Sequence, residues 1–215
     1  MKHPNSSSIS LATGALACFF LASLGLLLMH VLRADYQLAS HMISDYAVGR
    51  LGWLMVAFFL LWSVGILLFS ASLLLSGPSS AGRKLGAFLL GVTSIGLLVS
   101  AAYPTDLPGA PDTPDGNIHT LSFLVNVCSL LVAIPLLSFG LREHQGWGTY
   151  RRIASILAVL VVLAFFLQLF TLRKDMPYGL TNRLFVVMLF AWFISTAARL
   201  RTLRSNGPRT TSPEA

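Results

Sequence analysis

The chain of 215 residues is 55% hydrophobic and only 11% charged, with a mean hydropathy of +0.73. Soluble domains carry roughly a quarter charged residues, so this composition excludes an ordinary soluble protein and indicates a polytopic membrane protein. The formal net charge is +7, but the basic residues lie between the apolar blocks and do not form one run, which argues against a nucleic-acid partner.

Six apolar segments are long enough to cross a bilayer, which takes about 20 residues. We expect membrane-spanning helices at about 11–33, 51–76, 84–103, 118–141, 152–172 and 181–200. Breaks separate them, most clearly the proline-rich stretch 103–116, because proline cannot continue a helix. The sequence therefore predicts an all-α fold, a polytopic transmembrane bundle of six helices in one domain, 11–203.

Charge on the connecting segments predicts how the bundle sits in the membrane. Six spans place both termini and the second and fourth loops on one side, which carries a formal charge of +8, against −1 on the other side. The side with the Lys and Arg excess faces the cytoplasm, so we expect a multi-pass protein of the cell membrane with both termini cytoplasmic. Residues 1–10 are then a cytoplasmic N-terminus, and 204–215 a polar, disordered cytoplasmic tail.

Ionisable and hydrogen-bonding residues gather at the predicted outer mouths of the helices. Such groups are costly near hydrocarbon, so they usually face the bundle interior and mark function. We therefore predict one outer site with the candidate catalytic residues His41, Ser44, Asp45, Asp106, His119 and Arg183.

The predicted fourth helix adds a polar stripe. His119, Ser122, Asn126 and Ser129 follow one another at steps of three, four and three residues, which places them on one helical face. A polar face of this kind turns toward other helices or a wet cavity and away from lipid. We predict that Ser122, Asn126 and Ser129 line a cavity, together with Gln168 from the fifth helix; packing between helices is the alternative for the two serines.

Four segments in fixed order carry a family resemblance: SHMISDYAVGRLGWLM, YPTD, IHTLSF and GLTNRLFVVMLFAW. Together they resemble the prokaryotic membrane proteins grouped as domain-of-unknown-function family 998, and the resemblance covers nearly the whole chain. It implies a multi-helix integral membrane fold and no established activity. The motif positions that match are Ser44, Asp45, Pro104, Asp106, His119 and Arg183.

A looser resemblance links ISD to the six-helix Frag1/DRAM/Sfk1 proteins, which are associated with lipid handling. Those proteins have Ile-Ser-Asp-Thr-Gly where this chain has ISDYAVG. This resemblance implies a membrane lipid as the partner.

The first functional hypothesis is a membrane-embedded hydrolase that acts on a lipid amide or ester. Zinc would be held by Asp45, Asp106 and His119, with His41 as a fourth ligand or general base, since His and carboxylates suit this metal. A metal-free version uses His119 as the base, oriented by Asp106. The set resembles that of the alkaline ceramidases, but their His-x-x-x-His pair is absent here.

Two further hypotheses remain open from the sequence. In one, the outer polar residues are the mouth of a binding or transport cavity; six helices are few for a lone transporter, so this hypothesis includes a homo-oligomer. In the other, ion pairs simply lock the helix mouths together, through Asp45–Arg50 and through Asp106 with His119 or Arg183.

Overall fold

The structure is a computed structural model that describes residues 6–76, 80–140, 147–173 and 176–202. Within these ranges the chain is all-α, and each long helix is apolar enough to cross a membrane, which confirms the predicted six-helix transmembrane bundle. The elements are α1 (Ser6–Leu32), the 3-10 helix η1 (Ile43–Ala47), α2 (Gly52–Leu75), α3 (Ala81–Ala102), α4 (Pro114–Gly140), α5 (Tyr150–Thr171) and α6 (Tyr178–Thr202).

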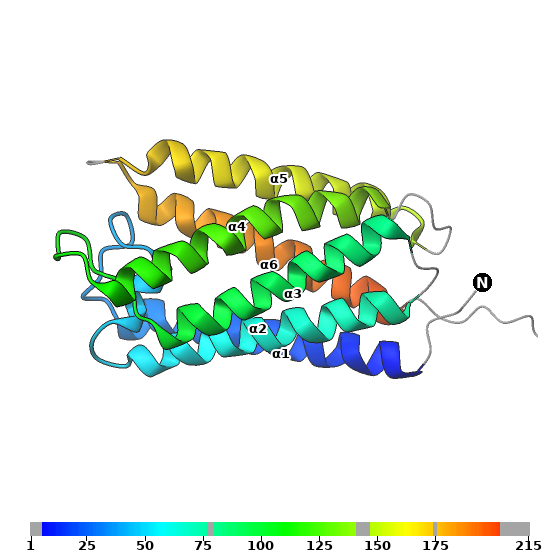
Figure 1. The fold of residues 1–215 in the computed structure, drawn as a ribbon, viewed down its shortest axis with the longest axis horizontal. Helices are drawn as coiled ribbons and strands as arrows, with labels where there is room; N and C mark the ends of the chain where they lie inside the picture. Colours follow the sequence, from blue (N-terminus) through cyan, green and yellow to red (C-terminus); the bar gives the residue numbers. More distant parts are fainter. Residues whose placement is uncertain (1–5, 77–79, 141–146, 174–175, 203–215) are drawn as a thin grey trace, which may run out of the picture.

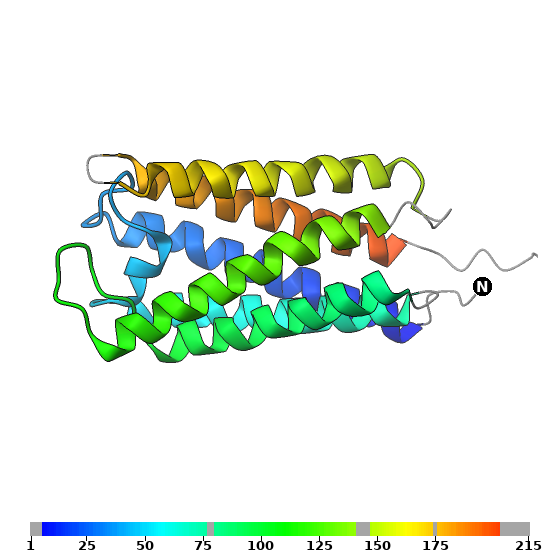
Figure 2. The same ribbon diagram turned by 45° about the horizontal axis from the view of Figure 1, so that its top comes forward.

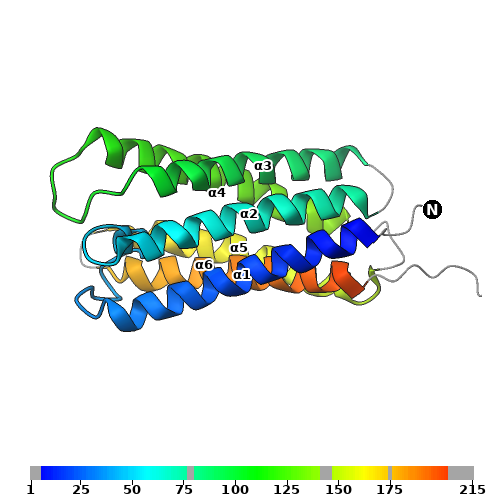
Figure 3. The same ribbon diagram turned by 90° about the horizontal axis from the view of Figure 1, so that it is seen from below.

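The helices form a closed ring in the order of the chain (Figures 1 and 3). Each helix packs on the next one in the sequence, and α6 returns to pack on α1. The start of α1 and the end of α6 lie at one end of the ring, which we call the terminal end. The opposite end, where α1 connects to α2 and α3 to α4, is the roof end.

Aromatic side chains and small polar residues hold the ring together. Phe19, Phe69 and Phe193 meet in the centre, with ring centroids 5.2–6.5 Å apart. Ser63 of α2 and Ser94 of α3 each donate to the other's carbonyl, at 2.9 and 3.1 Å. Lipid provides no hydrophobic force between helices, so such close contacts and interhelical hydrogen bonds carry their association.

Five of the six helices begin earlier than the hydrophobic pattern predicts, and α1 and α4 do so by the most residues. α1 starts at Ser6, so residues 6–10 of the expected cytoplasmic segment are helical. Ser8 is buried against α2, where Ser72 donates to its carbonyl at 2.7 Å. α4 starts at Pro114, because proline at the first helical position needs no N–H partner there. Residues 1–5 and the predicted disordered tail 204–215 lie outside the described residues.

The fourth helix crosses the bundle obliquely. Figure 2 shows α4 close to α5 at the terminal end and diverging from α5 and α6 toward the roof end. Along α3 the contact is tight: a Cβ on Gly86 would lie 2.6 Å from the side chain of Leu137, so only glycine fits there. The tilt of α4 leaves room for a cavity between α4 and α6 at the roof end.

Candidate functional site

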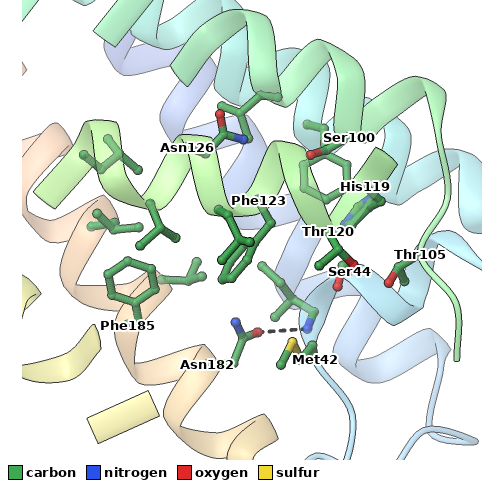
Figure 4. A pocket seen from close by; sticks show the side chains of 18 of the residues that line it. Met42, Ser44, Ser100, Thr105, His119, Thr120, Phe123, Asn126, Asn182 and Phe185 are labelled. Carbon is green, nitrogen blue, oxygen red and sulfur yellow. Dashed lines mark hydrogen bonds between the residues drawn. The ribbon is translucent and has the colours of Figure 1, made fainter. Parts of the chain in front are cut away.

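A cavity of about 230 Å³ lies inside the ring at the roof end. Residues of α2, α3, α4 and α6 line it. The loop between α1 and α2, residues 33–51, contains η1 and covers one end of the cavity with Met42, Ile43 and Ser44; we call this loop the roof. Most of the lining consists of leucine, valine and aromatic side chains, and none of the described lining residues is Asp, Glu, Lys or Arg. Figure 4 shows the polar side chains of Ser44, Ser100, Thr105, His119 and Thr120 gathered at one end of it, and those of Asn126 and Asn182 farther along.

The cavity reaches the outer surface of the bundle between α4 and the end of α5. Leu124 and Leu172 both line it, yet they are 52% and 51% exposed. Leu172 directly follows the last residue of α5. The opening is therefore lateral, on the side of the bundle between α4 and the end of α5.

His119 contributes a buried imidazole to the polar end of the cavity. Its Nδ1 lies 2.8 Å from the carbonyl oxygen of Tyr103, at the end of α3. A carbonyl only accepts, so Nδ1 carries the proton and Nε2 the lone pair. The ring packs edge-on against Phe59 of α2, with centroids 5.9 Å apart. The tautomer and orientation of His119 are therefore set by α2 and α3.

Asp106 shapes the start of α4. Its carboxylate accepts from the backbone N–H of Thr113 at 2.9 Å and from the Thr113 hydroxyl at 2.8 Å. Thr113 in turn caps the helix, since its Oγ1 accepts from Gly116 N–H at 3.0 Å. The carboxylate packs so closely on Gly116 that a Cβ there would overlap it. In the described chain Asp106 bonds neither His119 nor Arg183.

Asp45 lies buried in η1. Its carboxylate accepts from Met42 N–H at 3.1 Å and so closes the first turn of η1. Burial raises the pKa of Asp45 from 3.8 to about 6, against the opposing effects of His41, the Met42 N–H and Arg183. The predicted ion pair with Arg50 does not form, because the Arg50 side chain is exposed and the carboxylate is turned to the backbone.

Arg183 lies in the second turn of α6 and binds the roof. Its guanidinium donates to the carbonyls of Leu38 and His41, at 3.0 and 2.6 Å, and to the Tyr46 hydroxyl at 3.1 Å. Further bonds run to the carbonyl of Gly179 in the same helix, at 2.9 Å, and from Nε to Nε2 of His30, at 2.8 Å. Arg183 is therefore a cross-link between α1, the roof and α6.

The structure does not bring the three predicted metal ligands together. Over the described residues, no three His, Cys, Asp or Glu side chains lie close enough to hold a metal ion. Asp45, Asp106 and His119 each turn to a local backbone partner instead, at Met42, Thr113 and Tyr103 respectively. His41, expected to assist them, packs its ring on Tyr36 with centroids 4.7 Å apart.

The polar stripe of α4 faces α3. Ser122 shares a hydrogen bond of 2.8 Å with Ser100 of α3, and Asn126 packs on Gly96, where a Cβ would overlap its amide. Of the four residues predicted to line a cavity, Asn126 lines the one described above. Ser122, Ser129 and Gln168 are buried between helices and do not line it; Ser122 instead borders a separate hollow between α3 and α4.

Sequence reasoning missed two residues that shape the site. Asn182 accepts from Ile43 N–H at 3.0 Å and so holds the roof from α6 (Figure 4). His30 of α1 accepts from the Nε of Arg183. The position of Asn182, one residue before Arg183 in an otherwise apolar helix, was the available signal.

Comparison with known proteins places the chain in a family. Residues 16–199 match the model of a family described as "Protein of unknown function (DUF998)". The chain belongs to this family. No curated protein and no solved structure matches it. The match spans all six helices of this multi-pass protein, including the roof and the cavity-lining segments of α2, α3, α4 and α6.

Proposed function

We propose that this DUF998 protein binds a lipid-like amphiphile in the roof-end cavity. The observation that carries the proposal is the make-up of the lining: apolar side chains over much of it, hydroxyls with one imidazole gathered at one end, and the amides of Asn126 and Asn182 farther along. An apolar pocket with a few convergent polar groups is the usual form of a small-molecule site. The apolar chain of the ligand would lie among Phe123, Phe185 and Leu189, with its head near His119.

The size and opening of the cavity fit this ligand. An engineered apolar cavity of roughly 150 Å³ holds a benzene molecule, so about 230 Å³ has room for a short stretch of acyl chain. The rest of a longer chain would pass through the lateral opening beside Leu124 and Leu172. Entry from the membrane requires no passage through water.

The chemistry of the polar end favours a neutral head. An ionised group without a charged partner is costly to bury, and none of the described lining residues is an acid, Lys or Arg. The Nε2 lone pair of His119 accepts a hydrogen bond, and the hydroxyls of Ser44, Thr105 and Thr120 both donate and accept. A monoacylglycerol or a long-chain alcohol has the matching chemistry.

Binding is supported better than hydrolysis. The metal-free hydrolase needs His119 as a base oriented by Asp106, and here the Nδ1 of His119 is bound to the Tyr103 carbonyl while Asp106 is bound to Thr113. We also propose, from the charge asymmetry of the loops, that the terminal end is cytoplasmic and the cavity faces the outer half of the cell membrane.

Photocrosslinking tests the proposal. Protein in lipid nanodiscs is labelled with a monoacylglycerol that carries a diazirine on its chain, and the labelled residues are mapped by mass spectrometry. We expect labels on cavity-lining residues of α4 and α6, and at least a tenfold loss in Val127→Phe and Val186→Phe, which fill the cavity.

The matched controls are Val132→Phe and Val187→Phe, which add the same bulk on the lipid-facing surface of the same two helices, where the valines are 52% and 57% exposed. Both should label like the unmodified protein. Labelling that is equal in all four variants, or that maps only to the lipid-facing surface, would contradict the proposal.

A further inference from the structure

The amide of Asn182 has a fixed orientation inside the cavity. Asn182 lies in the second turn of α6, lines the cavity and is only 4% exposed. The amide atom that faces the Ile43 N–H, at 3.0 Å, must be the oxygen, because a backbone N–H only donates. The nitrogen of the same amide lies on the side away from this bond (Figure 4). Asn182 therefore turns its Nδ2 toward the interior of the cavity.

The Nδ2 of Asn182 is a donor in need of an acceptor. It carries two N–H groups and no lone pair, and it bonds no acceptor among the residues that the structure describes. The other lining residues of α6, Phe185, Val186 and Leu189, have no polar side-chain atom. A buried donor left without a partner costs roughly 1–3 kcal/mol. A molecule in the cavity is therefore stabilised when it supplies an acceptor to this nitrogen.

Asn182 lies next to the polar end of the cavity. It bonds Ile43, and the following roof residue, Ser44, is gathered with His119 at the polar end (Figure 4). The Nε2 of His119 is an acceptor, since its Nδ1 donates to the Tyr103 carbonyl. The cavity thus offers a ligand an acceptor on the α4 wall and a pair of donors on the α6 wall.

The second asparagine of the cavity, Asn126, serves a different position. It follows His119 by seven residues on α4, which places it about 10 Å farther from the roof end at 1.5 Å per residue. Its amide packs on Gly96 of α3, where a Cβ would overlap the Oδ1. Asn126 therefore lies beside the part of the cavity that the apolar chain of the ligand would fill, and Asn182 lies beside the head.

An acyl ester with a hydroxyl head matches the donors of Asn182 and the acceptor of His119. The ester carbonyl oxygen has lone pairs and no proton, so it accepts from Nδ2, while a hydroxyl donates to Nε2. A long-chain alcohol has no carbonyl and leaves Nδ2 without a partner. An acyl amide adds an N–H donor, and the α6 wall offers it no side-chain acceptor, since the Oδ1 of Asn182 is already bonded.

We propose that Asn182 determines the ligand specificity of the cavity, because its Nδ2 binds the carbonyl oxygen of an acyl ester. The inference rests on the proposed function and narrows its ligand to acyl esters with a neutral hydroxyl head, of which monoacylglycerol is the simplest. Long-chain alcohols and ether-linked lipids are then poor ligands. The two ends of one amide hold the roof and the ligand at the same time.

Two lipids that differ only at the carbonyl test the inference. A 1-monoacylglycerol and the 1-O-alkylglycerol of the same chain length share the chain, the linking oxygen and both hydroxyls, and the ether has a methylene in place of the carbonyl. Native mass spectrometry of the full chain, released from detergent micelles, measures the dissociation constant of each lipid. We expect the ester to bind about tenfold more tightly, a difference of about 1.4 kcal/mol.

Substitutions assign this preference to one side chain. Asn182→Leu keeps the size of the side chain and removes the Nδ2 donors, so the two lipids should bind alike. It also removes the bond to Ile43, but a looser roof weakens both lipids equally and leaves the ratio of their dissociation constants unchanged. Asn182→Ala serves the same purpose if the leucine variant does not fold. Asn126→Leu makes the same change at the other asparagine of the cavity and should keep the preference of about tenfold.

The inference is overturned if the unmodified protein binds the ester and the ether equally, which would show that water in the cavity satisfies Nδ2. It is also overturned if the preference persists in the Asn182 variants, or if Asn126→Leu abolishes it. Equal binding of both lipids leaves the proposed function standing and removes only the role of Asn182. Binding of neither lipid to the unmodified protein removes both.

Discussion

Two loops at the roof end, residues 33–51 and 103–113, are held in different ways. Two arginines hold the first loop. Arg33 at its start donates to the carbonyls of Val48 and Arg50 near its end, at 3.1 and 2.6 Å, and Arg183 of α6 binds its middle. The second is held by its own Asp106, which binds Thr113 seven residues later. The first loop depends on long-range contacts and the second on a local cap.

This difference decides what each loop contributes to the cavity. The first loop folds over the ring and becomes its roof, so its position depends on α1 and α6. The second positions one helix start and with it His119, whose place is otherwise set by Tyr103 and Phe59. Substitutions in the first loop should therefore lower the stability of the whole bundle, and those in the second should affect only the start of α4.

The largest effect is expected for Arg33→Ala. The Arg33 side chain is buried, and its pKa is raised mainly by the hydrogen bond to Asp35. Two bonds from a charged group to carbonyls are lost, each worth roughly 1.5–3 kcal/mol, so the free energy of unfolding should fall by about 4 kcal/mol. Unfolding in mixed detergent micelles measures this. Arg50→Ala, on the same loop with an exposed side chain, should change little; equal losses would contradict the assignment.

The second-largest effect is expected for Asp45→Asn, and it concerns how the free energy of unfolding depends on pH. Its folded pKa of about 6 lies above the ordinary 3.8, so the folded protein holds the proton more tightly than the unfolded chain. The stabilisation is complete below pH 3.8 and is lost as the pH rises through about 6. This lowers the free energy of unfolding by up to about 3 kcal/mol. Asp45→Asn, whose amide oxygen still accepts from the Met42 N–H, does not titrate and should avoid this loss.

Unfolding curves at several pH values between about 4 and 7.5 measure the difference between the Asp45→Asn variant and the unmodified protein. The difference should grow with pH in favour of the variant. Asp112→Asn, an exposed aspartate of the second loop, is the matched control and should give parallel curves. A constant difference for Asp45→Asn would show that the carboxyl is not buried as described.

A smaller effect is expected for Thr113→Ala in the second loop. The substitution removes the cap of α4 and one of the two partners of Asp106, which should cost about 1–2 kcal/mol. Thr113→Ser keeps the hydroxyl and should restore most of the loss. Hydrogen exchange should speed up at the start of α4 and stay unchanged in the first loop. Faster exchange in the first loop would show that the two loops are coupled.

The smallest effect is expected for Asp106→Asn. The amide oxygen still accepts one hydrogen bond from Thr113, so only one bond is lost, worth about 1 kcal/mol or less. Thermal unfolding compared with Asp106→Ala, which loses both bonds, should rank the two variants in that order. A large loss in Asp106→Asn alone would point to a partner beyond Thr113.

Much of the fold follows from the sequence, because the helices are long apolar runs and their number sets the topology. Their ends were less predictable: four of residues 6–10 are serines, yet Ser8 is buried and hydrogen-bonded to α2. The residues of the polar stripe are buried inside the bundle. The partner of this stripe was not predicted, since nothing in the stripe itself shows that Gly96 and Ser100 lie opposite.

The candidate site was harder to predict for a different reason. Asp45, Asp106 and His119 were all expected at the same end of the bundle, and they do lie there. Whether they converge depends on the direction of each side chain, and each takes the nearest backbone group. Long-range pairs such as Arg183 with His30, 153 residues apart, leave no local pattern in a single sequence.

The closed ring in chain order also bears on how the protein is made. Each helix leaving the ribosome finds its packing partner in the helix synthesised just before it, so five of the six seams in the ring form as synthesis proceeds. Only the seam between α6 and α1 joins the two ends of the chain. Arg183 and Asn182 belong to that last seam, so the cavity acquires its fixed roof only once the final helix has been inserted.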